Sequence, residues 1–397
     1  MAQNPDPSKP VPDQTKPLSA ASPVRTIPSD TGKAPQAGTA LCLSGGGYRA
    51  MVFHIGAIWR LHEAGMLKPL KRISSVSGGS ITAAMLALAW PKLTAAPFSR
   101  PAFEAEFVKP LRALAGRTID VAAVAIGLLP GVTVSQRIAA AYDTIFKGKT
   151  LQDLPDEPRF VINATNVQTG SLWRFMKPYM ADYRVGVVDR PQVSLADAVT
   201  ASSAFPPVLS PMQLPLDPAE VREVDGNDLH QEPYISGAVL SDGGVYDNLG
   251  LETAWKNYDT ILVSDGGGHI DPEGAPATDW PRHSYRVLNL IDNQVRALRK
   301  RQVIDSYQAP PADANHRNGT YWGIRTNIAD YHLPDPLPCP HDRTLALAAI
   351  STRLASLDDA QQQKLINWGY AVCDAALRRH MNVAPPPPVF PFPAAGV

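Results

Sequence analysis

The stretch TALCLSGGGYRAMVFHIGAIWRLHEAGM, residues 39–66, decides the fold class. Residues 39–44 form a short apolar run, three glycines follow, and residues 48–66 then repeat apolar side chains at helical spacing. This order predicts a buried strand, a tight turn and a helix. The glycine turn is a place where an anion or a developing negative charge could be held, because backbone N–H groups converge in a loop that lacks Cβ atoms.

The same alternation of strand-like and helix-like runs continues along the chain. Beyond the first strand we expect further strands at residues 73–77, 159–167, 238–244 and 258–267, with an outer strand near residues 321–328. Strands that alternate with helices predict an α/β fold with a mostly parallel sheet. In such sheets sites form at the carboxyl ends of strands, where three glycine-rich turns fall in this sequence.

The composition excludes several classes of protein. The 397 residues are 44% apolar, and 37 basic side chains balance 37 acidic ones, which argues against a nucleic-acid binder. Three cysteines, an odd and sparse set, argue against a disulfide framework. The chain has no run of about eighteen apolar residues and no signal-peptide pattern. We therefore expect a soluble cytoplasmic protein.

The domain organisation follows from local composition. Residues 1–37 are rich in Pro, Ser, Thr, Lys and Asp and predict a disordered leader, whereas residues 384–397 predict an extended Pro-rich tail. Residues 38–383 form one globular domain. Within it, the apolar run 121–132 is either a lid or membrane-dipping element or a buried helix. The basic run 293–303 could meet anionic headgroups, but a solvated helix face is the favoured interpretation.

The glycine loop alone leaves its ligand open. It comprises Gly45, Gly46 and Gly47. The lysine and Ser/Thr of a phosphate-binding P-loop are missing, and the dinucleotide pattern G-x-G-x-x-A is matched only loosely. A tight strand-to-helix turn without a ligand also fits.

A serine follows the second predicted strand in SSVSGGS, residues 74–80. Ser77 precedes Gly78 and Gly79, as in a nucleophile elbow, where a sharp turn lifts one hydroxyl out of the sheet. The usual G-x-S-x-G pattern has Ser75 in place of its first glycine, and this small residue leaves the turn possible. Ser75 and Ser80 are the rival nucleophiles, but we expect Ser75 within the strand and Ser80 within the helix.

A serine nucleophile needs a base. In LSDGGVYDNLG, residues 240–250, Asp242 ends an apolar strand before Gly243 and Gly244, where its carboxylate could accept a hydroxyl proton. Asp265 repeats this D-G-G pattern, and His269 is the one histidine close to such a turn. Each aspartate taken alone also fits a structural turn residue.

Taken together and in order, GGG-Y-R, S-V-S-G-G and D-G-G resemble the patatin-like phospholipases, a family of lipid acyl hydrolases with bacterial members. The block AVTASSAFPPVLSP, residues 198–211, resembles the segment that precedes the aspartate in this family, and the resemblance spans roughly residues 38–270. It implies a three-layer α/β fold and a dyad of Ser77 and Asp242, with Asp265 as a turn residue. It also implies an oxyanion hole at the glycine loop and supporting roles for Arg49, Gly78, Gly79, Gly243 and Gly244.

The implied activity is hydrolysis of acyl esters by a phospholipase A-type enzyme, a lysophospholipase or an esterase. The expected substrate is a membrane phospholipid or another acyl lipid, reached by peripheral membrane contact. No cofactor, metal or nucleic acid is expected. Arg49 would hold the loop or meet a phosphate. Two alternatives remain: a catalytically silent or signal-regulated lipid-binding module, and a nucleotide-binding α/β protein.

Overall fold

A computed structural model describes residues 34–119, 133–207, 209–381 and 383–397. Most of the expected leader and the apolar run 121–132 therefore lie outside the described residues. The strands are β1 (Gln36–Leu43), β2 (Leu70–Val76), β3 (Arg159–Asn166), β4 (Ser171–Phe175), β5 (Tyr179–Asp182), β6 (Gly186–Asp189), β7 (Met212–Pro215), β8 (Val221–Arg222), β9 (Gly237–Asp242), β10 (Tyr258–Asp265) and β11 (Asn318–Gly323).

The helices fill the connections between these strands. The α-helices are α1 (Gly47–Glu63), α2 (Gly78–Thr94), α3 (Arg100–Phe103), α4 (Lys109–Ala115), α6 (Val134–Phe146), α7 (Leu195–Ser202), α8 (Gly244–Asp247), α9 (Glu252–Trp255), α10 (Trp280–Gln308), α11 (His341–Ala348) and α12 (Asp359–His380). A π-helix, Glu104–Val108, joins α3 to α4, and 3₁₀ turns span Leu151–Asp153 and Ile328–Tyr331.

One mixed sheet runs in the order β11-β10-β1-β2-β3-β4-β5-β6-β8, with β9 paired to β3 and β7. The strands from β11 to β3 are parallel, whereas β4 to β8 continue the sheet as an antiparallel meander. Five of the expected strands appear at their predicted places, with β1 beginning at Gln36, inside the expected leader. The outer strand expected near residues 321–328 lies earlier in the chain, at Asn318–Gly323. The meander was not predicted, because its strands are short and lack intervening helices.

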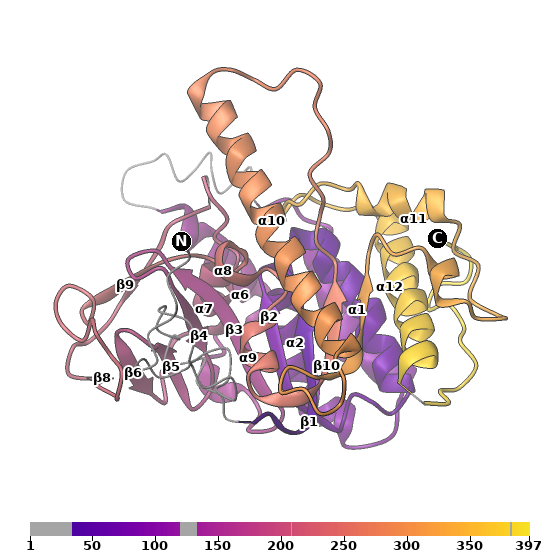
Figure 1. Ribbon diagram of the computed structural model, residues 1–397, viewed down its shortest axis with the longest axis horizontal. Helices are drawn as coiled ribbons and strands as arrows, with labels where there is room; N and C mark the ends of the chain where they lie inside the picture. The colour runs from indigo at the N-terminus through magenta and orange to yellow at the C-terminus, as the bar shows by residue number, and fades with distance from the viewer. Residues whose placement is uncertain (1–33, 120–132, 208, 382) are drawn as a thin grey trace, which may run out of the picture. The chain divides into compact units, whose positions relative to one another are not determined.

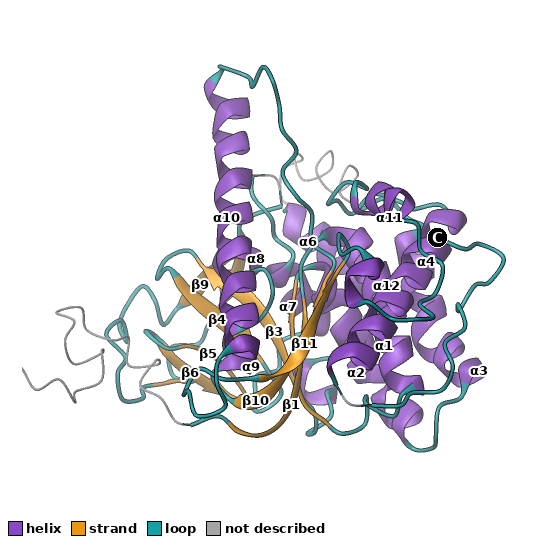
Figure 2. Ribbon diagram, turned by 45° about the vertical axis from the view of Figure 1, so that its right-hand side comes forward, coloured by secondary structure: helices purple, strands orange, loops and turns teal. Residues whose placement is uncertain are grey.

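The alternating side chains of β1 show why helices cover both faces of the sheet. Leu41 and Leu43 point into a large core with α1, α2 and α12, whereas Ala40 and Cys42 point into a smaller core. The smaller core is closed by Leu251 just before α9 and by residues of α9 and α10. Figures 1 and 2 show these two helical layers about the sheet. The predicted α/β fold with a parallel centre and helices on both faces is confirmed.

The Pro-rich tail packs against the helical layer of the large core. The side-chain amide of Asn367 on α12 donates to the backbone carbonyls of Phe392 and Gly396. Phe390 and Val397 are buried. Among the described helices, none combines the length and the apolar character needed to cross a bilayer.

Candidate active site

The pairing of β3 brings two strand ends together. Along one edge β3 pairs with β4. Along the other edge it pairs first with β2, whose Val76 lies opposite Asn163, and then with β9, whose Asp242 lies opposite Ala164. Because β2 is parallel and β9 antiparallel to β3, these two strands run toward each other. Their carboxyl ends meet, and Ser77 lies next to Asp242.

Ser77 occupies the sharp turn between β2 and α2. Its backbone has φ 51° and ψ −121°, a conformation that L-residues rarely adopt and that marks locally stored strain. The rival serines are engaged elsewhere. The buried Ser75 hydroxyl, in β2, donates to the carbonyl of Val161, and the buried Ser80 hydroxyl, in α2, lies 3.0 Å from the Ser75 hydroxyl.

Ser202, at the carboxyl end of α7, holds the turn on both sides. Its hydroxyl accepts the backbone N–H of Ser77 at 2.9 Å and donates to the carbonyl of Asn163 at 2.6 Å. Its own carbonyl accepts the backbone N–H of Gly243 at 3.2 Å, directly after Asp242. One residue therefore ties the serine turn to the aspartate turn. Ser202 lies in the block of residues 198–211, so the sequence indicated this segment but not the contact.

The Asp242 carboxylate lies in a strongly desolvated place. Its pKa is raised to about 7, chiefly by burial and to a smaller extent by the negative charge of Asp292. Hydrogen bonds from the backbone N–H of Gly244, at 2.7 Å, and from the Ser77 side chain act against this rise by stabilising the carboxylate. A carboxyl group with a pKa near 7 can exchange a proton close to neutral pH. Among the described residues, no histidine hydrogen-bonds to Ser77 or Asp242.

The glycine loop lies directly beside the serine turn. Gly46 and Gly47 have φ of 143° and 60°, which residues with a Cβ atom rarely adopt. The Gly47 carbonyl lies so close to Gly78 that a Cβ there would overlap it. The N–H of Gly45 faces the backbone carbonyl and side-chain Oδ1 of Asn248, at 3.0 and 3.1 Å. Within the described chain, the N–H groups of Gly46 and Gly47 donate no hydrogen bond to protein.

A series of hydrogen bonds connects this loop to helix α10. The Asn248 side chain that accepts from Gly45 donates through Nδ2 to Asp292 at 3.3 Å. Burial raises the pKa of Asp292, and the charge of Arg296 on the same helix partly opposes that rise. Sequence reasoning missed Asn248, although it stands within the D-G-G segment. Nothing in the sequence signalled Asp292, which lies fifty residues beyond Asp242.

Arg49 is a buried side chain that ties the glycine loop to two distant segments. Its Nε donates to the carbonyl of Gly266 at 3.2 Å, and Nη2 donates to the Thr352 hydroxyl at 2.9 Å. Nη1 donates to the carbonyl of Ile350. Burial lowers the pKa of the guanidinium to about 10. All these partners belong to the protein, so the arrangement supports loop holding rather than phosphate contact.

Asp265 lies at the end of β10, on the other side of β1. Its carboxylate accepts the Tyr321 hydroxyl at 2.7 Å and the N–H of Gly267 at 2.9 Å. Burial raises the pKa of Asp265, but the charge of Arg296 and the hydrogen bonds from Tyr321 and Gly267 together keep it below its usual value. These contacts are those of a turn residue held by its own neighbours. His269 is exposed on the loop that follows.

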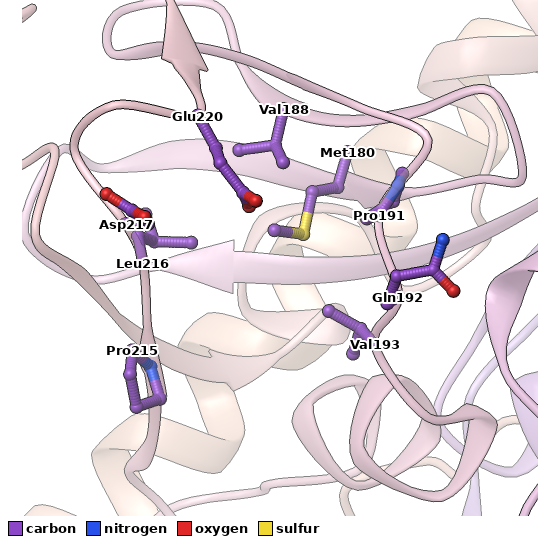
Figure 3. A pocket seen from close by; sticks show the side chains of 9 residues that line it. All are labelled: Met180, Val188, Pro191, Gln192, Val193, Pro215, Leu216, Asp217 and Glu220. Atoms are coloured by element: carbon purple, nitrogen blue, oxygen red, sulfur yellow. The ribbon is translucent and has the colours of Figure 1, made fainter.

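A separate pocket of about 240 Å³ lies at the meander end of the sheet (Figure 3). Met180 of β5 and Val188 of β6 form one side, and Asp217 and Glu220 lie across from them. None of its lining residues belongs to the two turns described above. No cluster of three or more potential metal-ligating side chains occurs among the described residues.

The fold and the strained turn place the chain among three-layer α/β proteins with a serine elbow. The sequence profile of the patatin-like phospholipases matches residues 41–255, more than half of the chain, and the chain therefore belongs to this family. No curated protein sequence gives a significant match.

Several solved structures are similar to this chain at low sequence identity, and the human enzyme below shares its fold. Human GIVD cytosolic phospholipase A2 superimposes with a TM-score of 0.51 at 12% identity, covering 85% of this chain and 61% of that protein. The same enzyme in complex with methyl gamma-linolenyl fluorophosphonate gives 0.50 at 13% identity, covering 85% and 57%. VipD from Legionella pneumophila gives 0.37 at 16% identity, covering 87% and 67%. The chain thus spans less than two thirds of the human enzyme that it resembles.

Proposed function

We propose that the chain is a lipid acyl hydrolase in which Ser77 is the nucleophile and Asp242 the base. The observation that carries this proposal is the position of Ser77 beside the end of β9, next to a buried carboxylate whose pKa is about 7. A carboxylate of ordinary acidity would be a much weaker base at neutral pH, because proton-transfer efficiency follows basicity.

The reaction proceeds in two balanced steps. Asp242 takes the hydroxyl proton of Ser77 while Oγ attacks the ester carbonyl, and the protonated carboxyl then gives that proton to the departing alcohol oxygen. This leaves an acyl group on Ser77. A water molecule next gives its proton to Asp242 and attacks the acyl carbonyl. The fatty acid leaves, and the proton returns from Asp242 to Oγ.

The glycine loop supplies the oxyanion hole in this proposal. The free N–H groups of Gly46 and Gly47 are the donors, at the positive end of the α1 dipole. Gly45 contributes by fixing the loop, since its own N–H is bound to Asn248. In hydrolases, the loss of one such donor raises the barrier by roughly 3 kcal/mol. Gly78, Gly79, Gly243 and Gly244 support the site by allowing its two turns to pack tightly.

Phospholipids and other acyl lipids are the substrate class that we propose, reached at the surface of a bilayer. The test is incubation of mixed phospholipid vesicles with the wild-type protein and with Ser77→Ala, followed by mass spectrometry of the released lipids. We expect free fatty acid and lysophospholipid with the wild type alone. Binding of vesicles without any product, together with no covalent labelling by a fluorophosphonate, would instead establish the catalytically silent lipid-binding module.

A further inference from the structure

Helix α10 has an unusual distribution of polar and apolar side chains. Its 29 residues begin at Trp280, directly after Asp279, whose carboxylate accepts the N–H of Arg282. The face packed on the protein carries polar groups: Arg296 and Ser306 are buried, and Asp292 contacts Asn248. Apolar side chains lie on the opposite, outward face. A soluble helix normally shows the reverse arrangement.

The outward face carries a row of apolar side chains. At 100° per residue, Trp280, Val287, Ile291 and Leu298 fall within an arc of about 40°. Their side chains are 79%, 41%, 53% and 58% exposed. In the same projection Arg296 and Val303, both buried, lie on roughly the opposite side of the helix. We call these four residues the outward stripe.

The concentration of exposed apolar side chains on α10 is local. Nine large hydrophobic residues are exposed in the described part of the chain, and six of them lie on this helix: Trp280, Tyr285, Val287, Leu290, Ile291 and Leu298. Figures 1 and 2 both show the N-terminal half of α10 standing clear of the sheet and of the other helices. Single exposed hydrophobics need no explanation, but a contiguous patch marks a contact surface.

The charge of α10 indicates the kind of surface that it meets. The chain as a whole has no net charge, whereas α10 carries six basic residues and two acidic ones. Arg282 and Arg286 lie near Trp280, where they pair with Asp279 and Glu273 of the preceding loop. Arg301 is exposed close to the other end of the stripe. Apolar side chains with tryptophan and arginine on one helix match the boundary between acyl chains and anionic headgroups.

The inward face of α10 fixes this stripe to the candidate active site. Arg299 stacks on Tyr246 of α8, with 5.8 Å from the guanidinium carbon to the ring centroid, and its Nε lies 4.0 Å from the Asp247 carboxylate. The Asp292 carboxylate accepts a hydrogen bond from the Asn248 side chain, which in turn accepts the backbone N–H of Gly45. A surface bound by the stripe is therefore held in a fixed relation to the turn after Asp242 and to the glycine loop.

We propose that the outward stripe of α10, with its flanking arginines, docks the protein on an anionic lipid bilayer, lying in the interface rather than crossing it. This deepens the proposed function, on which the choice of a lipid surface rests. The basic residues provide attraction to anionic headgroups, and the stripe buries its side chains between them.

The test measures vesicle flotation of the full chain carrying Ser77→Ala, so that hydrolysis does not change the vesicles. Vesicles of phosphatidylcholine alone are compared with vesicles that also contain phosphatidylserine. We expect binding to the anionic vesicles, weakened by salt, and a loss of roughly tenfold or more in Trp280→Ser/Ile291→Ser. Arg282→Gln/Arg286→Gln should weaken binding to the anionic vesicles only.

The matched control is Val167→Ser/Val389→Ser, which changes two exposed apolar residues outside α10 and should bind like the parent. Circular dichroism and thermal unfolding verify that each variant is folded. Equal binding by the stripe variant and its parent would overturn the proposal. The proposal would also be overturned if light scattering showed a dimer that depends on the stripe while no vesicles were bound. A monomeric protein that binds neither kind of vesicle would overturn it as well. Stripe-dependent binding combined with no hydrolysis by the wild type would leave docking standing and reject only the proposed function.

Discussion

The hydroxyl of Ser202 accepts the backbone N–H of Ser77 at 2.9 Å, while the carbonyl of Ser202 accepts the N–H of Gly243. A residue outside both turns thus sets their separation. The Ser202 hydroxyl also lies 2.9 Å from that of Ser80. The strained backbone of Ser77 needs such support, because a local conformation of this kind persists only where its surroundings enforce it.

We expect Ser202→Ala to lower both stability and turnover. The buried N–H of Ser77 would lose its partner, which costs about 1–3 kcal/mol of unfolding free energy. A relaxed elbow should also lower kcat by roughly tenfold or more, because small displacements of a nucleophile are costly. Denaturant unfolding and ester hydrolysis measure the two effects. Ser203→Ala is the control, since it removes a neighbouring buried hydroxyl that donates to the Val199 carbonyl and accepts from the Tyr142 hydroxyl. An equal loss of kcat in this variant would contradict the positioning role of Ser202.

Covalent labelling should identify Ser77. A fluorophosphonate probe is expected to modify this residue, because it occupies a strained turn beside the buried Asp242 carboxylate, the proposed base. Peptide mass spectrometry locates the adduct. Ser75→Ala and Ser80→Ala should still be labelled, since the hydroxyls of both residues are buried and engaged with protein. Label found on either serine instead of Ser77 would reject the assignment.

Asp242 should set the acid limb of the pH profile. Activity is expected to fall about tenfold per pH unit below about pH 7, as the carboxyl binds its proton and ceases to act as a base. Asp242→Asn should abolish turnover, whereas His269→Ala, on an exposed loop, should retain it. Initial rates across the pH range test this, and full activity of Asp242→Asn would reject the dyad.

The Asp242 carboxyl should also make the free energy of unfolding depend on pH. Activity should rise with pH, whereas the stability of the fold should fall. The folded pKa of this carboxyl is raised, so the folded state retains a proton that the unfolded state has lost. The stability contribution of that proton is complete below the unfolded pKa of 3.8 and declines as pH rises through about 7. We expect Asp242→Asn to be more stable than the wild type above pH 7, with a smaller difference near pH 4. Urea unfolding at both pH values measures it, and a difference that does not change with pH would contradict this account.

Removal of the Asp292 charge should move the acid limb. This charge raises the pKa of Asp242, so Asp292→Asn is expected to shift half-maximal activity to lower pH. The asparagine can still accept from Asn248 through its Oδ1, which keeps the loop contact. Asp305→Asn, an exposed change on the same helix, is the control and should leave the profile in place. Identical profiles for both variants would show that Asp292 does not act on Asp242.

Arg49 should act on stability rather than on lipid headgroups. Arg49→Met removes buried donors to Gly266, Ile350 and Thr352, and we expect a loss of roughly 3 kcal/mol or more in unfolding free energy. Headgroup preference should not change in whatever activity remains. Thermal unfolding and product analysis with neutral and anionic vesicles provide the measurement. A selective loss with anionic lipid at unchanged stability would favour a phosphate contact instead.

The basic run of residues 293–303 illustrates a limit of sequence analysis. A solvated helix face was the favoured interpretation, but it is wrong for Arg296, which is buried against the loop after β10. Helical periodicity fixes which residues share a face. Helical periodicity does not show which face of a helix packs against the protein when buried charged side chains can find partners there. For the same reason, the sequence could not show that the apolar stripe of α10 points outward.

The order of local motifs determined the class of fold and the residues of both turns, because strand, glycine turn and helix are encoded within a few neighbouring residues. Ser77, Asp242 and the glycine loop could therefore be predicted as site residues without coordinates. The meeting of β2 and β9 along one edge of β3 depends instead on two pairings with β3, between Val76 and Asn163 and between Ala164 and Asp242, each of which joins residues far apart in the chain. The roles of Ser202, Asn248 and Asp292 depend on the same long-range packing. Such contacts leave no local pattern, since each partner is chosen by the folded sheet and not by its neighbours in the chain.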